Sequence, residues 1–227
     1  MAVERGAVTL YERWFLTPAG MYVDDKEKEL LINSMRFKRD ERVLEIGCGS
    51  GRYIEYLGDI GLNPAGVEPV DELVRRARLK SSIKADQVIR APYENIPMAD
   101  NSFENVIFMN SFAFAADKDA AMKEAFRIAS KKIGVGFLNR NSLTTLFKGK
   151  ERTSVYHDAT PLSGKDIADI AAKTLPAGGY ELKLYYTLYL PIKWGFLMPW
   201  VDNILEKVNF AAGDFGMAII TKKTSVK

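Results

Sequence analysis

Cysteine and histidine are nearly absent from this sequence of 227 residues, which contains one of each, Cys48 and His157. A single cysteine cannot form a disulfide within the chain and is typical of a reducing compartment, so we expect a cytoplasmic location. A zinc site built from cysteine and histidine needs three or four such ligands. The two counts therefore exclude such a site, and we expect no metal.

Long apolar runs and an excess of charge of one sign are also missing. The longest apolar runs, such as residues 112–116, fall far short of the ~20 residues that a membrane-spanning helix needs. The first 14 residues carry charges where a signal peptide would have an apolar core. The 32 basic and 29 acidic residues leave a net charge of +3. We therefore expect no membrane span and no dedicated surface for nucleic acid.

What the sequence does contain is a regular alternation of strand and helix patterns. Repeated units of this kind predict a parallel sheet covered on both faces, with the ligand beyond the carboxyl ends of the strands. Asp24 and Glu27 have the spacing of a capping box at the start of the first helix. Helices are expected over 24–36, 51–60, 70–80, 118–129 and 163–173, and strands over 42–46, 64–69, 86–90, 103–109, 132–138, 181–190 and 215–223.

A glycine-rich loop follows the first predicted strand, in the sequence Glu45-Ile46-Gly47-Cys48-Gly49-Ser50-Gly51-Arg52. Its glycines permit a tight turn and the close approach of a ligand to the backbone. A dinucleotide fingerprint, G-x-G-x-x-G, would place its last glycine where Arg52 stands. The carboxylate of Glu45 would repel a pyrophosphate, but it would attract an ammonium or sulfonium group.

A second acidic residue, Glu68, ends the next predicted strand, where a carboxylate can accept hydrogen bonds from a ribose diol. Together with Glu45, it indicates a nucleoside with a positively charged tail that lacks phosphate. S-adenosylmethionine (SAM) fits that description. The alternatives are a Rossmann-like dehydrogenase and a SAM-binding module without turnover.

Several segments, in the correct order, resemble the motifs of class I SAM-dependent methyltransferases. They are VLEIGCGSGRY (43–53), GVEP (66–69), ENIPMADNSFENVIF (94–108) and EAFRIA (124–129). The opening YERWFLTPAGMYVDDKEKELL (11–31) is similar to a bacterial and archaeal branch that acts on small molecules. The resemblance implies a Rossmann-like α/β fold, with a mostly parallel seven-stranded sheet, helices on both faces and an antiparallel last strand.

The resemblance also implies a division of labour along one domain, residues 1–227. Residues 1–36 would form an N-terminal helical lid, 37–139 the cofactor-binding half and 140–227 the substrate-binding half. Tyr22 or Trp14 is expected near the methionine end of SAM, although both could simply anchor the first helix. The other implied cofactor residues are Glu45, Ile46, Gly47, Cys48, Gly49, Gly51, Glu68, Pro69, Pro92, Tyr93, Met109 and Asn110.

One cofactor position departs from the family pattern. Where relatives often carry an aspartate that holds the adenine amino group, this chain has Pro92, followed by Tyr93. We expect backbone groups near Tyr93 and apolar contact to hold the adenine instead. The alternative is that Tyr93 only packs in its loop.

The reaction implied by the resemblance is direct displacement of a methyl group from the sulfonium of SAM to a small oxygen, nitrogen or carbon acceptor. Cys48 lies inside the cofactor loop, which argues against a covalent route through a cysteine. His157 is a candidate general base, because its unperturbed pKa is near ~6.5. Tyr156 and Arg140 are further candidates on the acceptor side. The alternative for His157 and Arg140 is a place on the solvent-facing surface.

Two further possibilities remain open at this stage. An RNA or protein methyltransferase would need a basic face beside the pocket, and none is evident. The apolar segment 189–200 could line a pocket for a bulky substrate, touch a membrane surface or form the contact of a homodimer. The default expectation is that Trp194 and Trp200 pack in the core.

Overall fold

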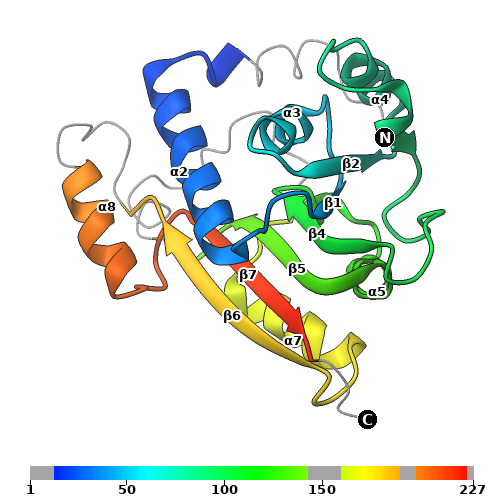
Figure 1. Ribbon diagram of the computed structural model, residues 1–227. Helices are drawn as coiled ribbons and strands as arrows, with labels where there is room; N and C mark the ends of the chain where they lie inside the picture. The colour runs from blue at the N-terminus through cyan, green and yellow to red at the C-terminus, as the bar shows by residue number, and fades with distance from the viewer. Residues whose placement is uncertain (1–12, 143–159, 190–197, 224–227) are drawn as a thin grey trace.

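A computed structural model describes residues 13–142, 160–189 and 198–223, and their strands form one twisted sheet (Figure 1). The strand order is β3-β2-β1-β4-β5-β7-β6. The strands are β1 (Arg42–Ile46), β2 (Asn63–Glu68), β3 (Val88–Arg90), β4 (Phe103–Met109), β5 (Ala129–Leu138), β6 (Tyr180–Thr187) and β7 (Phe215–Lys222).

Strand direction follows the expected pattern. β1 pairs in parallel with β2 and with β4, β2 with β3, and β4 with β5. β7 lies between β5 and β6 and is antiparallel to both. The predicted seven-stranded, mostly parallel sheet with an antiparallel last strand is therefore confirmed.

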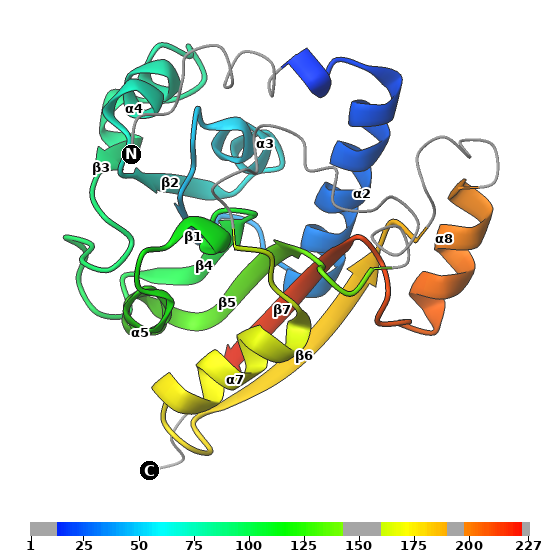
Figure 2. The same cartoon turned by 180° about the vertical axis from the view of Figure 1, so that it is seen from behind.

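Helices cover both faces of this sheet. On one face, α2 (Pro18–Met35) and α3 (Arg52–Asp59) pack over β1, β2 and β7. On the other, α5 (Lys118–Ile128) and α7 (Gly164–Thr174) pack against each other and the sheet, as the view from behind shows (Figure 2). α4 (Asp71–Arg78) lies beside β2 and β3, and α8 (Met198–Lys207) beside β6.

The beginning of α2 differs from the prediction. The helix starts at Pro18, and Thr17 caps it by accepting a hydrogen bond from the backbone amide of Gly20 at 3.1 Å. Proline suits the first helical turn because it has no amide hydrogen to leave unpaired. The interpretation of Asp24 and Glu27 as a capping box was therefore wrong, because both residues lie inside the helix.

The apolar segment 189–200 lies only partly within the described residues. Tyr189 is fully buried and donates a hydrogen bond through its hydroxyl to the backbone oxygen of Tyr186, at 3.0 Å. Residues 198–200 open α8, a helix that the sequence analysis did not predict. Among the helices of the described ranges, none is long and apolar enough to cross a membrane.

Candidate functional site

The glycine loop joins β1 to α3 at the carboxyl edge of the sheet. Gly47, Gly49 and Gly51 all have positive φ, at 77°, 55° and 82°. A β-carbon added at Gly47 would lie 2.3 Å from the β-carbon of Ser111, whereas one added at Gly49 would meet nothing within 4 Å. The backbone at Gly49 therefore faces open space, where a ligand can approach it closely.

Glu68 braces this loop from the end of β2. One carboxylate oxygen accepts a hydrogen bond from the amide of Gly49 at 3.0 Å, and the other accepts one from the amide of Val70 at 2.9 Å. The side chain is buried, and this burial raises its pKa although the two amide hydrogen bonds oppose the shift. Each oxygen still has acceptor capacity, because a carboxylate offers about four lone-pair sites.

Glu45, two residues before Gly47, is buried with no hydrogen-bond partner for its Oε2 atom within the described residues. Burial raises its pKa to about 8, and the nearby charge of Glu68 adds to the shift, whereas Lys80 opposes it. A buried carboxyl without a partner is costly, so this atom marks a place where a cationic or hydrogen-donating ligand would be stabilising.

Tyr93 stands beside the loop, as the sequence analysis expected for a residue of the adenine side. Its hydroxyl lies 2.6 Å from where a β-carbon on Gly47 would be, and the ring packs edge-on against Phe108 at 6.4 Å. Its neighbour Pro92 is exposed. Pro69, half-buried after Glu68, accepts a hydrogen bond from Arg90 through its backbone oxygen.

The side chains of Cys48 and Ile46 turn away from the open side of the loop. The Cys48 thiol packs on β2, where a β-carbon added at Gly66 would lie 2.5 Å from its Sγ atom, and it belongs to an apolar cluster with Ile54. Burial raises the pKa of this thiol well above its usual range. Ile46 is core. The backbone of these two residues therefore faces the open side of the loop, and burial disfavours the thiolate form that a nucleophilic cysteine needs.

A third buried carboxylate, which the sequence analysis missed as a site residue, lies on α2. Glu27 accepts hydrogen bonds from the hydroxyl of Tyr53 at 3.0 Å and from the side-chain amide of Asn110 at 3.3 Å. Burial raises the pKa of Glu27 to about 7. Asn110 directly follows Met109, the last residue of β4, and Met109 and Asn110 are both buried. Its backbone φ of 62° is uncommon for a residue other than glycine.

Arg52 closes the space between α2 and the glycine loop. Its guanidinium pairs with Asp24, lies 3.8 Å from the Glu27 carboxylate and stacks 3.9 Å from the ring centre of Phe15. Trp14 packs edge-on against the same ring at 4.9 Å and is partly exposed. The N-terminal aromatic residues therefore lie close to the loop through Phe15 and Arg52.

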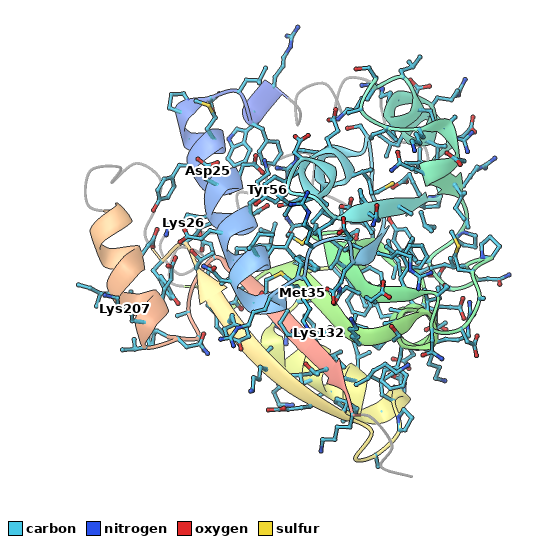
Figure 3. The ribbon with its side chains drawn as sticks, viewed as in Figure 1. Asp25, Lys26, Met35, Tyr56, Lys132 and Lys207 are labelled. Atoms are coloured by element: carbon cyan, nitrogen blue, oxygen red, sulfur yellow. The ribbon has the colours of Figure 1, made fainter. Side chains whose placement is uncertain are left out.

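Two predicted site residues take part in other contacts. Tyr22 donates a hydrogen bond from its hydroxyl to Asp202 of α8 at 2.6 Å, so this side chain joins α2 to α8. Figure 3 shows Lys26, one turn further on, on the side of α2 that faces α8, where it pairs with Glu206 at 3.2 Å.

Arg140, the second of these residues, is half-exposed and pairs with Asp166 at 2.9 Å. His157 and Tyr156 lie outside the described residues.

The groups at this edge of the sheet are mainly hydrogen-bond acceptors. Glu45, Glu68 and Glu27 are all buried, and Asn110 Oδ1 has no partner within the described ranges. Within the part of the chain that the structure describes, no group of three or more His, Cys, Asp or Glu side chains could hold a metal ion. A ligand with a ribose diol and positively charged groups supplies the hydrogen-bond donors and the charge that Glu45 and Glu68 lack, so these two carboxylates fit SAM and conflict with a pyrophosphate.

Comparisons with known proteins agree with this chemistry. A family model described as a methyltransferase domain matches residues 44–132. Over 109 residues the chain is 29% identical to a SAM-dependent Diels-Alderase of Talaromyces variabilis, a match covering 44% of this chain and 37% of that protein. It is 28% identical over 104 residues to a ubiquinone biosynthesis O-methyltransferase of Xanthomonas oryzae pv. oryzae, covering 44% of each. The matches therefore span less than half the length of these curated relatives.

Solved structures extend the likeness over nearly the whole chain. A SAM-dependent methyltransferase from Thermotoga maritima, described as a possible histamine N-methyltransferase, superposes with a TM-score of 0.71 at 27% identity, over 95% of this chain and 96% of that one. A SAM-dependent methyltransferase from Archaeoglobus fulgidus has a TM-score of 0.67 at 17% identity, covering 95% and 99%, which shows the shared fold.

The strand order, the glycine loop with its acidic neighbours and these likenesses define one class. The chain contains a methyltransferase domain, matched over residues 44–132, and its fold is that of the class I SAM-dependent methyltransferases, a class whose cofactor is SAM.

Proposed function

We propose that this protein transfers the methyl group of SAM to a small-molecule acceptor by direct displacement. SAM supplies an activated methyl group on its sulfonium. The protein's own task is to align the acceptor with that group and to exclude water, and no covalent enzyme intermediate is needed. The unreactive, buried Cys48 thiol agrees with a route that does not use it.

The observation that carries the proposal is the Glu45–Glu68 pair below an open glycine backbone. In the proposed complex, Glu68 accepts hydrogen bonds from the ribose diol, and Glu45 balances the positive charge of the methionine tail. Tyr93 then packs beside the adenine. Gly49 lets the nucleoside approach the backbone, because a β-carbon there would meet nothing within 4 Å, whereas the missing side chain at Gly47 makes room for Ser111.

A small acceptor is favoured by the charge distribution of the described surface. The basic cluster of α4 is paired within its own helix, since Arg75 contacts Asp71 at 3.1 Å and Arg76 contacts Glu72 at 3.4 Å. A net charge of +3 adds no strong field that would hold a polyanion. RNA or a protein substrate is therefore the weaker assignment.

Calorimetry with SAM and with S-adenosylhomocysteine (SAH), the demethylated product, tests the cofactor assignment. We expect saturable binding of both and at least a tenfold loss of affinity in Glu68→Ala, because two charge-assisted hydrogen bonds to the ribose are removed. Glu72→Ala removes a partly exposed carboxylate four residues away, so it is the matched control and should bind normally. Unchanged affinity in Glu68→Ala would refute the ribose assignment.

A second candidate function is the use of SAM without methyl transfer. It deserves a test because one curated relative bears the name of a SAM-dependent Diels-Alderase. Incubation with methyl-labelled SAM and a panel of small nucleophiles decides between the two. Label that moves to an acceptor, with equimolar SAH, supports methyl transfer, whereas tight SAM binding with no label transfer supports the alternative.

A further inference from the structure

The Glu27 carboxylate receives hydrogen bonds from two elements at once. Tyr53 of α3 donates its hydroxyl proton, and Asn110 after β4 donates an amide proton, at 3.0 Å and 3.3 Å. Glu27 itself belongs to α2 and is 3% exposed. In sequence, Tyr53 lies 26 residues from Glu27 and Asn110 lies 83 residues from it. They therefore meet only in the folded protein, beside the glycine loop.

The contact with Glu27 fixes which way the Asn110 amide points. An ionised carboxylate can only accept hydrogen bonds, so the amino group of the amide must face it. The amide oxygen, Oδ1, is then turned away, and it is buried without a partner within the described residues. The neighbouring residue, Ser111, borders Gly47 directly. An unmet acceptor atom thus lies at the junction of β4 with the glycine loop.

The hydrogen-bonding capacity left in this cluster discriminates between acceptor chemistries. Glu27 has unused lone pairs, and Asn110 Oδ1 has two unused lone pairs. The donors of the existing hydrogen bonds are the Tyr53 hydroxyl and the Asn110 amino group. An alcohol carries one hydrogen and can satisfy only one of these oxygens. An ammonium group has enough hydrogens to bond both, and it also balances a buried carboxylate.

We propose that the methyl acceptor is an amine, held by hydrogen bonds from its nitrogen to Asn110 Oδ1 and to the Glu27 carboxylate, which takes the proton that must leave before attack. This rests on the proposed methyl transfer and adds the class of substrate to it. The geometry requires no residue outside α2, α3 and the end of β4.

The proton and electron changes balance in three steps. The bound ammonium gives one proton to Glu27, leaving a neutral amine whose lone pair is free. The lone pair forms the new nitrogen–carbon bond while the carbon–sulfur bond breaks, and its electron pair stays on sulfur. The methylated product leaves as an ammonium ion, and Glu27 returns its proton to solvent.

The environment of Glu27 suits this role. Burial raises its pKa to about 7, the hydrogen bonds from Tyr53 and Asn110 oppose that rise, and the charge of Lys28 opposes it as well. Arg52, at 3.8 Å from the Glu27 carboxylate, and its partner Asp24 are further charged groups beside it. A base whose pKa is close to the operating pH both accepts and releases a proton efficiently.

The binding test uses SAH-loaded protein and two probes of the same shape, 2-phenylethylamine and 2-phenylethanol, followed by histamine as a second amine. Calorimetry should show the amines binding at least tenfold more tightly than the alcohol. Glu27→Gln should remove that preference while SAH affinity stays within twofold. Glu29→Gln, a half-exposed carboxylate on the same helix, is the control and should keep the preference.

The kinetic test asks whether Glu27 handles a proton. With an amine probe that is methylated, Glu27→Gln should lower kcat by about a hundredfold or more and abolish the acid limb of its pH profile. Thermal melting reports whether Glu27→Gln is folded, and Asn110→Ala, which removes Oδ1 but keeps the carboxylate, is the second variant if it is not. Asn110→Ala should weaken amine binding at least tenfold.

The outcomes separate this proposal from the one it rests on. Failure to bind SAM or SAH would overturn methyl transfer itself. Three results, each with normal SAH binding, would overturn the amine assignment alone. No amine binds, the alcohol binds as tightly as the amine, or amine affinity is unchanged in the folded Glu27→Gln or Asn110→Ala protein.

Discussion

Binding of SAM should release a proton from the Glu45 carboxyl. In the free protein this buried group has a pKa raised to about 8, so at pH 7 it holds roughly nine-tenths of a proton. A positively charged ligand beside it stabilises the carboxylate and lowers its pKa. Binding therefore includes ionisation of Glu45, and affinity should increase with pH until Glu45 is already ionised in the free protein.

The size of the effect follows from that pKa. The ionised fraction is about 0.01 at pH 6, about 0.09 at pH 7 and about 0.5 at pH 8, so affinity should rise roughly tenfold over the first interval and roughly fivefold over the second. Each factor of ten corresponds to about 1.4 kcal/mol. Glu68, whose pKa is also raised, shares in this proton release because the two carboxyls interact.

Calorimetry in phosphate and in Tris buffer measures the released protons directly, because the two buffers have different ionisation enthalpies. Glu45→Gln is the decisive comparison, since the amino group of SAM titrates identically with both proteins. The variant should bind more weakly at pH 8 and release nearly one proton fewer at pH 7. Equal proton release from the two proteins would refute the role assigned to Glu45.

Three further predictions concern the same loop. Gly47→Ala should abolish SAM binding and lower the free energy of unfolding by roughly 1–3 kcal/mol, because the new methyl group would collide with Ser111 and Tyr93 at a positive φ. Calorimetry measures the binding and denaturant unfolding measures the stability, and normal binding would contradict the close packing. The Cys48 thiol should resist alkylation in the native protein and react fully in urea, because it is buried with a raised pKa. Mass spectrometry measures the labelling, and fast labelling of the native protein would contradict this by showing an exposed thiolate. The free protein should lose stability as pH rises from about 4.5 to about 8, because Glu45 is harder to ionise when folded than when unfolded. Urea unfolding should show this loss in the wild type and a smaller loss in Glu45→Gln. An equal dependence of the unfolding free energy on pH in the two proteins would count against this role of Glu45.

Local signals in the sequence were sufficient for the sheet and the loop. Strand β1 is a short apolar run that ends at clustered glycines, and β4 and β7 are equally apolar, so their burial could be anticipated. Glu45 and Glu68 could be predicted as site residues because each lies at the carboxyl end of a strand, and parallel strands bring their carboxyl ends to one edge. These features depend on spacing within a few residues or on the general geometry of such folds.

The role of Glu27 could not be anticipated for the opposite reason. Its partners lie far away in sequence, and its spacing from Asp24 imitates a cap, whereas the true cap is Thr17 followed by Pro18. Only the packing of α2 over α3 and the end of β4 makes it a buried carboxylate. The Thr-Pro pair was the signal that could have moved the helix start, because proline favours the first turn and threonine the cap.

Similar long-range contacts explain Tyr22 and Arg140. Tyr22 was expected near SAM because its segment precedes the first helix, but its hydroxyl bonds Asp202, 180 residues away. Arg140 follows β5, as a pocket residue would, yet Asp166 at the start of α7 pairs with it at the surface. In both cases the partner, rather than the position in sequence, decides where the side chain lies.

The place of β7 between β5 and β6 has a consequence for how the protein is made. As the chain leaves the ribosome, β1 to β5 can pair as they appear, since each of β2 to β5 has one neighbouring strand already synthesised. β6 emerges next but has no partner strand yet, because within the sheet it pairs with β7, which is complete only at Lys222. The unpaired edges of β5 and β6 must therefore wait together on the nascent chain, and exposed strand edges are sites of aggregation. A pause in translation between residues 187 and 215 would prolong the time during which these two strand edges are exposed.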